Sequence, residues 1–246
     1  MSDRMRSTAP GHGRDGRHRR PVPLRKRLRS AVVATSVFLV AAGAAKADER
    51  TVAAGLDIVL HGSAPERPGC AACHLQNGAG QPDVGIPRLA GLTSSYIENQ
   101  LAYFAKGERR NTAMAPYARM LSPAQRQEVT DYYASLPVPA MEALPTVPEA
   151  QARGAALFMD GDPRAGLLSC SQCHGPTALG VGDFSPALAG QSGPYVAEKL
   201  RQWRSGAMRD PKGAFMRAEA SHLSEPDIDA VAAYVASLKD DQKVSK

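Results

Sequence analysis

The sequence predicts an all-α protein in which one small domain occurs twice in tandem. Three observations support this prediction: apolar residues recur at helical spacing, strand signals are nearly absent, and the elements of the first half return in the same order in the second. The stretch from Pro87 aligns with the stretch from Pro186 at an offset of 99, and the stretch from Leu121 aligns with that from Leu223 at an offset of 102. We therefore expect an internally duplicated fold.

Two amphipathic helices are predicted in each half. The first has apolar residues at i, i+4 and i+7, which are Ile97, Leu101 and Phe104 in one half and Val196, Leu200 and Trp203 in the other. The second has them at i, i+3, i+4 and i+7, which are Val129, Tyr132, Tyr133 and Leu136, and then Val231, Tyr234, Val235 and Leu238. Ser122 and Ser224 each precede a Gln or an Asp by three positions, which predicts a capping box at the start of each closing helix.

The first 47 residues are expected to form a secretory signal peptide that is removed. A basic stretch precedes an apolar run of 15 residues and the small-residue sequence Ala45–Ala47, which is the order of segments in such a signal. The apolar run is shorter than the roughly 20 residues that span a bilayer as a helix, which disfavours an uncleaved anchor. We expect export, with cleavage near Ala47.

The mature chain is expected to contain two domains joined by a stiff linker. The repeat gives boundaries of 48–136 for the first domain, 137–148 for the linker and 149–246 for the second domain. The linker holds Pro137, Pro139, Pro145 and Pro148. Because proline-rich segments are extended, the linker is predicted to be neither helix nor strand.

The basic character of the chain belongs to its leader. Residues 1–47 hold 11 of the 30 Lys and Arg residues and 2 of the 24 Asp and Glu residues, which leaves 19 basic against 22 acidic residues in the mature chain. Binding to nucleic acid needs a basic face on the mature domain. We therefore expect no nucleic-acid partner.

All four cysteines lie in two copies of one pattern, Cys-x-x-Cys-His. The copies are Cys70–His74 and Cys170–His174. Two thiols at this spacing can form thioethers with the two vinyl groups of haem, and the histidine behind them can bind the iron as the proximal ligand. Each half has few aromatic residues, so that a large buried cofactor would complete a thin core. The pattern predicts two covalently bound haem c groups.

Two other interpretations of the cysteine pairs fit less well. A redox dithiol of the thioredoxin kind belongs in a βαβ setting, which these helical repeats do not offer. A structural zinc site needs four ligands in tetrahedral array, whereas each half supplies two thiols and one imidazole within five residues.

The sixth ligand of each iron can be sought in the repeat. Met114 and Met216 stand at equivalent positions, each seven residues before the Leu-Ser pair that opens a closing helix. Met120 and His222 form a second equivalent pair, whereas Met208 has no methionine counterpart. The repeat favours Met114 and Met216, since a methionine thioether stands at the same position in both halves. The alternative is that these methionines only fill the core.

These features together resemble the dihaem cytochromes c4. Each half contains Cys-x-x-Cys-His, then a Pro-x-Leu-Ala-Gly segment, an aromatic helix, a methionine ahead of Leu-Ser, and a closing helix with a tyrosine, Tyr132 or Tyr234. The resemblance covers about residues 50–240. It implies two tandem class I cytochrome c domains with haem-centred cores.

The resemblance also implies roles for individual residues. It implies thioether bonds from Cys70, Cys73, Cys170 and Cys173, and axial ligation of iron by His74, Met114, His174 and Met216. Pro87 and Pro186 would accept hydrogen bonds from the proximal imidazoles and so fix the orientation of the rings. One departure is Leu75, which stands where the family usually has a glycine after the first histidine.

The function implied by the resemblance is electron transfer in the periplasm. The protein would act as a shuttle between respiratory-chain donors and a terminal oxidase or reductase. The expected partners are redox proteins, namely a membrane quinol–cytochrome c oxidoreductase, a haem-copper oxidase or a periplasmic dehydrogenase. Because both iron positions would be filled, we expect no catalytic residues and no small-molecule substrate.

Two alternatives to a free shuttle are compatible with the same residues. The chain could be the cytochrome subunit of a larger dehydrogenase, of the flavocytochrome type. It could also be a dihaem peroxidase, in which one iron keeps an open or displaceable position. A peroxidase would need two domains that differ at the ligand, whereas the two halves match at these positions.

Overall fold

The computed structural model describes residues 37–139, 146–183 and 185–239, and for residues 37–48 it describes the backbone alone. Both halves of the repeat belong to one compact unit, which begins at Ala41. Most of the expected signal peptide lies outside the described residues. Within them, no helix combines the length and the apolar character that crossing a membrane requires.

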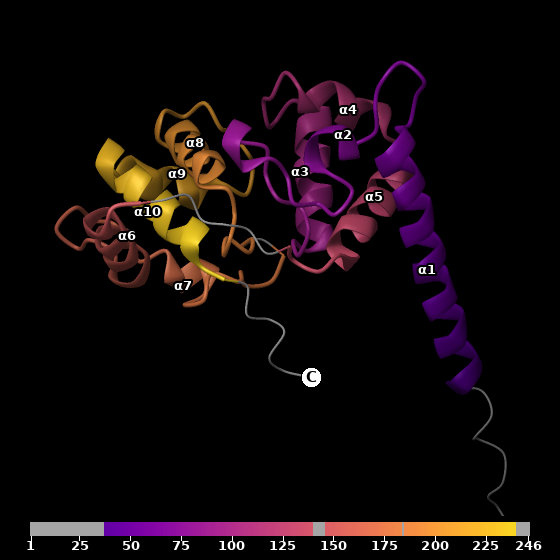
Figure 1. The fold of residues 1–246 in the computed structure, drawn as a ribbon, viewed down its shortest axis with the longest axis horizontal. Helices are drawn as coiled ribbons and strands as arrows, with labels where there is room; N and C mark the ends of the chain where they lie inside the picture. The colour runs from indigo at the N-terminus through magenta and orange to yellow at the C-terminus, as the bar shows by residue number, and fades with distance from the viewer. Residues whose placement is uncertain (1–36, 140–145, 184, 240–246) are drawn as a thin grey trace, which may run out of the picture. The chain divides into compact units, whose positions relative to one another are not determined.

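The described part of the chain is helical, with isolated bridges and no strand. The first half contains α1 (Val37–His61), α2 (Ala71–His74), the 3-10 helix η1 (Pro82–Val84), α3 (Ser94–Lys106), α4 (Met114–Met120) and α5 (Pro123–Ser135). The second half contains α6 (Pro148–Asp160), α7 (Ser171–His174), α8 (Gly193–Arg204), α9 (Ala214–Ser221) and α10 (Glu225–Ser237). In Figure 1, α3, α4 and α5 gather in one bundle and α6 to α10 in another, and contacts between these helices agree. The predicted all-α duplication is confirmed.

Side chains cap the helices where the sequence indicated. The Ser122 hydroxyl accepts the Gln125 N–H at 3.2 Å, and the Ser224 hydroxyl accepts the Asp227 N–H at 3.3 Å. In both cases the side chain at the third helical position accepts the N–H of the serine, which completes a capping box. The predicted starts of α5 and α10 are therefore confirmed.

The ends of the closing helices differ slightly from the periodic pattern. Leu136 and Leu238 continue the apolar spacing, but both have extended backbone and follow the last helical residue. Leu136 precedes Pro137, and a residue before proline is disfavoured in helical conformation. The apolar stripe therefore extends one residue beyond each helix.

A glycine in the opening helix of each half allows close contact with the closing helix. A Cβ atom at Gly55 of α1 would lie 2.0 Å from the Glu128 carbonyl oxygen of α5, and one at Gly154 of α6 would lie 2.1 Å from the Ala230 carbonyl oxygen of α10. Real Cβ atoms do not approach a carbonyl so closely. The two helix crossings thus depend on the same residue type at equivalent positions.

Each half has its own hydrophobic core. The buried residues of the first core are Ile58, Val59, Leu92, Ile97, Leu101, Phe104, Ala118, Leu121, Val129, Tyr132 and Tyr133. Those of the second are Leu157, Phe158, Leu167, Ala178, Ala189, Val196, Ala197, Leu200, Trp203, Met208, Ala220, Leu223, Ile228, Val231, Ala232 and Val235. The predicted stripes of α3, α5, α8 and α10 supply much of both cores.

Candidate haem-binding sites

The two Cys-x-x-Cys-His segments each form one helical turn. In α2 the His74 N–H donates to the Cys70 carbonyl oxygen at 2.9 Å, and in α7 the His174 N–H donates to the Cys170 carbonyl oxygen at the same distance. Residues three apart on such a turn lie on the same side of it. The turn therefore presents both thiols of a pair to one side, with the histidine at its end.

The thiols are not joined in disulfides, and their environment differs within each pair. Cys73 and Cys173 are exposed, whereas Cys70 and Cys170 are half-buried against the two cores. Burial raises the pKa of the Cys70 thiol to about 11, and likewise that of Cys170 to about 11. A redox-active dithiol needs a lowered pKa, because the thiolate is its nucleophile. The electrostatics therefore disfavour the dithiol interpretation.

The two histidines are buried and oriented by carbonyl groups. His74 Nδ1 lies 3.1 Å from the Pro87 carbonyl oxygen, and His174 Nδ1 lies 3.0 Å from that of Pro186. These are the hydrogen bonds that the resemblance implies. Because a carbonyl oxygen only accepts, Nδ1 carries the proton and the lone pair is on Nε2.

The same burial keeps the imidazoles neutral. It lowers the pKa of His74 and of His174 below the ordinary value, although the hydrogen bonds to the prolines act in the opposite direction. A neutral imidazole with a free Nε2 lone pair is the form that binds a metal.

Met114 and Met216 each lie in the first turn of a short helix and pack against a core. Met114 is the first residue of α4 and packs against the first core; its N–H donates to Asn111 Oδ1 at 2.8 Å. Met216 lies in α9 and packs against the second core. The structure thus brings Cys70 and Met114 to one core and Cys170 and Met216 to the other.

The competing pair lies farther out. Met120, the last residue of α4, is exposed, and so is His222, which caps the end of α9. The His222 ring lies beside Gly166, where a Cβ would come within 3.4 Å of it. The unmatched Met208 is buried in the second core and, like its counterpart Arg109, donates its N–H to the residue six positions before it.

The segment that leads into α9 is held by an aromatic ring. A Cβ on Gly213 would lie 1.8 Å from the Trp203 ring, so that the indole packs directly on the backbone of this residue. Trp203 is buried in the second core and is the one tryptophan of the whole sequence. Only glycine at this position allows α9, with Met216, to start so close to α8.

Leu75, the departure noted in the sequence, has a strained backbone. It caps α2 with φ 62° and ψ 156°, and its counterpart Gly175 has φ 77° and ψ 156°. This region of the backbone map is almost restricted to glycine and costs about 1–3 kcal/mol for other residues. The Leu75 side chain is 39% exposed, so its packing in the core offsets little of this strain. Its carbonyl oxygen accepts the Tyr133 hydroxyl at 3.3 Å.

We expect Leu75→Gly to stabilise the first half. Relief of the strain exceeds the added chain freedom of glycine by about 1 kcal/mol, which raises the melting temperature of a domain of this size by roughly 4–8 °C. Calorimetry of the haem-loaded protein measures this change. The matched control, Gly175→Leu, is expected to lower the melting temperature of the second half. An unchanged or lower melting temperature for Leu75→Gly would show that the strain is absent.

Sequence reasoning missed a polar contact between the two halves. Arg88 and Gln191 are both buried, and the Arg88 N–H donates to Gln191 Oε1 at 2.9 Å. A signal existed, since Gln191 stands where the first half has Leu92. The difference between the copies marks a residue that serves the contact rather than the shared domain fold.

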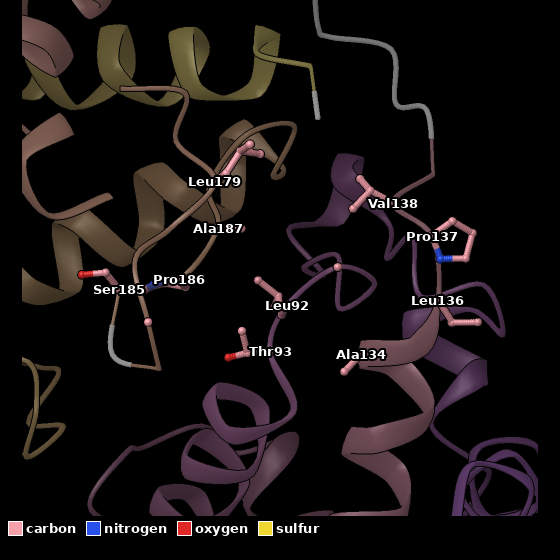
Figure 2. A pocket seen from close by; sticks show the side chains of 12 residues that line it. Leu92, Thr93, Ala134, Leu136, Pro137, Val138, Leu179, Ser185, Pro186 and Ala187 are labelled. Carbon is pink, nitrogen blue, oxygen red and sulfur yellow. The ribbon is translucent and has the colours of Figure 1, made fainter. Parts of the chain in front are cut away.

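A cavity of about 440 Å³ lies beside this contact. Figure 2 shows Leu92 of the first half between Val138, which follows α5, and Leu179, Pro186 and Ala187 of the second half. Ala187 also packs against the core of the first half. The halves therefore meet through buried hydrogen bonds next to a largely apolar cavity.

These donor sets suit haem c. Each half offers two thiols on one side of a turn, a neutral imidazole with its Nε2 lone pair available, and a thioether sulfur against the same core. Thiols form the covalent bonds, and imidazole with thioether is an axial pair used by cytochromes c. Fold and donor sets together define a dihaem c-type cytochrome.

Comparison with known proteins supports the assignment to the c-type cytochromes. The cytochrome c family matches residues 65–137 and 151–239. The chain is 40% identical over 174 residues to "Thiosulfate dehydrogenase electron acceptor" of Thiomonas intermedia, covering 70% of this chain and 80% of the relative. It is 37% identical to cytochrome c4 of Thiocapsa roseopersicina, covering 69% and 86% of the two chains.

A solved structure is similar over much of the chain. Thiosulfate dehydrogenase from Marichromatium purpuratum superposes with a TM-score of 0.70 at 35% identity and covers 75% of this chain. This chain spans 40% of that longer one. The chain belongs to the cytochrome c family, in its dihaem cytochrome c4 group, and carries two covalently bound haem c groups.

Proposed function

We propose that this chain is the electron acceptor of a thiosulfate dehydrogenase. The observation that carries the proposal is the likeness to two proteins named for that role, at 40% and 34% identity over about 70% of this chain. The similarity to part of the longer thiosulfate dehydrogenase chain of Marichromatium purpuratum supports it. This corresponds to the dehydrogenase-subunit alternative more closely than to a general respiratory shuttle.

We assign the cofactor to the residues that the resemblance implies. Cys70 and Cys73 would hold one haem c, and Cys170 and Cys173 the other. The axial residues would be His74 with Met114, and His174 with Met216. Bound haem c supplies a reversible one-electron couple between ferric and ferrous iron.

The residues around each site would orient the imidazole and fill the remaining iron position. Pro87 and Pro186 hold the two imidazole rings in fixed orientations through the hydrogen bonds at 3.1 and 3.0 Å. Met114 and Met216, which pack against the two cores, would each supply a thioether to the iron and so would leave no open position for a substrate. Because Cys73 and Cys173 are exposed, the side of each site that carries them would be the place where electrons enter and leave.

The donor and the onward acceptor are then both proteins. Thiosulfate is oxidised on the dehydrogenase, and this chain takes up the released electrons one at a time. We propose that it passes them to a terminal oxidase or reductase, as expected for the cytochrome c4 group, and that it works in the periplasm after removal of residues 1–47.

The proposal predicts reduction by thiosulfate only when the dehydrogenase is present. Oxidised haem-loaded protein is mixed with thiosulfate and a catalytic amount of the purified dehydrogenase, and the haem absorption is followed. Both haems are expected to become reduced, and omission of the enzyme should abolish the change. If the enzyme reduces an artificial acceptor while both haems of this chain stay oxidised, the assignment to thiosulfate oxidation is wrong.

A further inference from the structure

Two equivalent loops of the chain meet at the contact between the halves. The loops run from Pro87 to Leu92 and from Pro186 to Gln191, and we call them the proline loops. Their prolines are the ones whose carbonyl oxygens lie against His74 and His174. A contact between these loops therefore joins the supports of the two imidazoles.

The contact is a reciprocal pair of hydrogen bonds between the Gln191 side chain and the Arg88 backbone. The backbone N–H of Arg88 donates to Gln191 Oε1 at 2.9 Å, and Gln191 Nε2 donates to the backbone carbonyl oxygen of Arg88 at 3.0 Å. Arg88 is 0% and Gln191 4% exposed. Loss of a buried partner leaves polar groups unsatisfied, which costs about 1–3 kcal/mol. The glutamine side chain thus pairs with both backbone polar groups of a residue in the other half.

The Arg88 side chain strengthens the same junction. Its guanidinium donates to the Ala189 carbonyl oxygen in the second proline loop at 3.0 Å, and to the Ala90 carbonyl oxygen in its own loop. One buried side chain therefore holds both loops. In a buried network of this kind the bonds reinforce one another.

The bonds form a continuous path from one imidazole to the other. Starting at His74, a hydrogen bond leads to Pro87, and the chain leads to Arg88. Hydrogen bonds from Arg88 reach Gln191 and Ala189, and the chain leads back to Pro186 and so to His174. Electron tunnelling decays less steeply along bonded atoms than across gaps, and a rigid path also fixes the relative position of the two imidazoles.

The two residues that form this path do not recur at the equivalent positions of the other half. In the repeat, Leu92 occupies the position of Gln191, and Ala187 that of Arg88. Leu92 is buried and belongs to the first core, which shows that a proline loop folds with leucine at this position. The polar pair is therefore a property of the contact, and it can be removed without an impossible residue in the loop.

We propose that Arg88 and Gln191 are positioning residues that set the exchange of one electron between the two haem sites. In that exchange one ferrous iron becomes ferric and the other ferric iron becomes ferrous, with no bond made or broken and no proton required. The proposal rests on the axial ligation assigned above to His74 and His174. It adds that reduction of one haem site changes the reduction potential of the other through the proline loops.

The test is Gln191→Leu in the haem-loaded protein, with a photoreductant in place of the dehydrogenase. After partial reduction by a short flash, redistribution of the electron between the two haems is expected to be several-fold slower than in the unaltered protein. In a spectroelectrochemical titration, the separation of the two reduction steps is also expected to change. Because no dehydrogenase is present, this result is independent of whether thiosulfate is the source of electrons.

Ser95→Ala provides a matched control. The Ser95 hydroxyl donates to Asp183 Oδ1 at 2.7 Å, which is another hydrogen bond between the halves, but it lies outside the proline loops. It is expected to leave the exchange rate and the titration unchanged. If Ser95→Ala slows the exchange as much as Gln191→Leu does, general loosening of the contact explains both and the proposal is wrong.

A milder variant covers the case in which Gln191→Leu loses a haem or fails to fold. Gln191→Glu keeps the acceptor for the Arg88 N–H but loses the donor to its carbonyl oxygen, so that an intermediate slowing is expected. Wild-type exchange and an unchanged titration in either folded variant would overturn the proposal.

Discussion

Replacement of Cys170 and Cys173 together by serine is expected to yield a protein that carries one haem instead of two. Serine cannot form the thioether bonds that hold the second haem, and the first site lies in the other half with its own core. The second half is expected to lose its cooperative unfolding transition, because a thin core without its covalently bound cofactor is only marginally stable. Intact mass and the haem absorption per protein measure the loss.

The mirror variant, with Cys70 and Cys73 replaced, is the control for this result. It should also lose one haem, and the remaining haem should then belong to the second half. The mature protein without substitutions should begin near Asp48 and carry the mass of two haems. A double-serine variant that keeps both haems covalently attached would contradict the assignment of these cysteines.

Replacement of Met216 by alanine is expected to abolish the sulfur-to-iron charge-transfer absorption of the second haem and to lower its reduction potential. A thioether favours ferrous iron relative to water or a second imidazole, and axial ligand identity is a strong determinant of haem potential. The vacated position should also bind carbon monoxide, which the unaltered protein should not do. Met114→Ala should have the same effects on the first haem alone. Spectra and redox titrations of both variants give these quantities.

The competing pair of residues supplies the controls. Met120→Ala and His222→Ala are expected to leave both charge-transfer bands in place, since both side chains are exposed at the far ends of α4 and α9. A silent Met216→Ala beside a disrupted His222→Ala would mean that the second iron has two histidine ligands. Rapid binding of carbon monoxide by the unaltered protein would instead favour the peroxidase alternative.

Much of the fold could be predicted because local signals agreed with the repeat. Ser122 and Ser224 marked the starts of α5 and α10, and the spacing of apolar residues marked α3 and α8. The short helices that carry the cysteines and the methionines were not predicted as helices. A single turn such as α2 is too short to show periodicity.

The sequence indicated the donors of the site and the two prolines that orient the imidazoles, but not the contact between the proline loops or the strain at Leu75. Residue type and spacing pointed to the cysteines, histidines and methionines, because metal and thioether chemistry restricts the choice of residue. Arg88 differs from its counterpart Ala187, but a buried arginine and an exposed one look the same in a sequence, so its part in the contact was not predicted. The strain at Leu75 needed a backbone angle, which no pattern of residue types specifies.

Trp203, whose ring packs on Gly213, gives the second half a fluorescence signal that the first half lacks. The indole is buried near the segment that leads to Met216, and no other tryptophan occurs in the sequence. Indole emission is quenched by energy transfer to haem, so that tryptophan fluorescence of this protein comes from the second domain alone. Recovery of the emission during unfolding would follow the separation of Trp203 from its haem, and comparison with total haem absorption would show whether the two domains unfold together or in sequence.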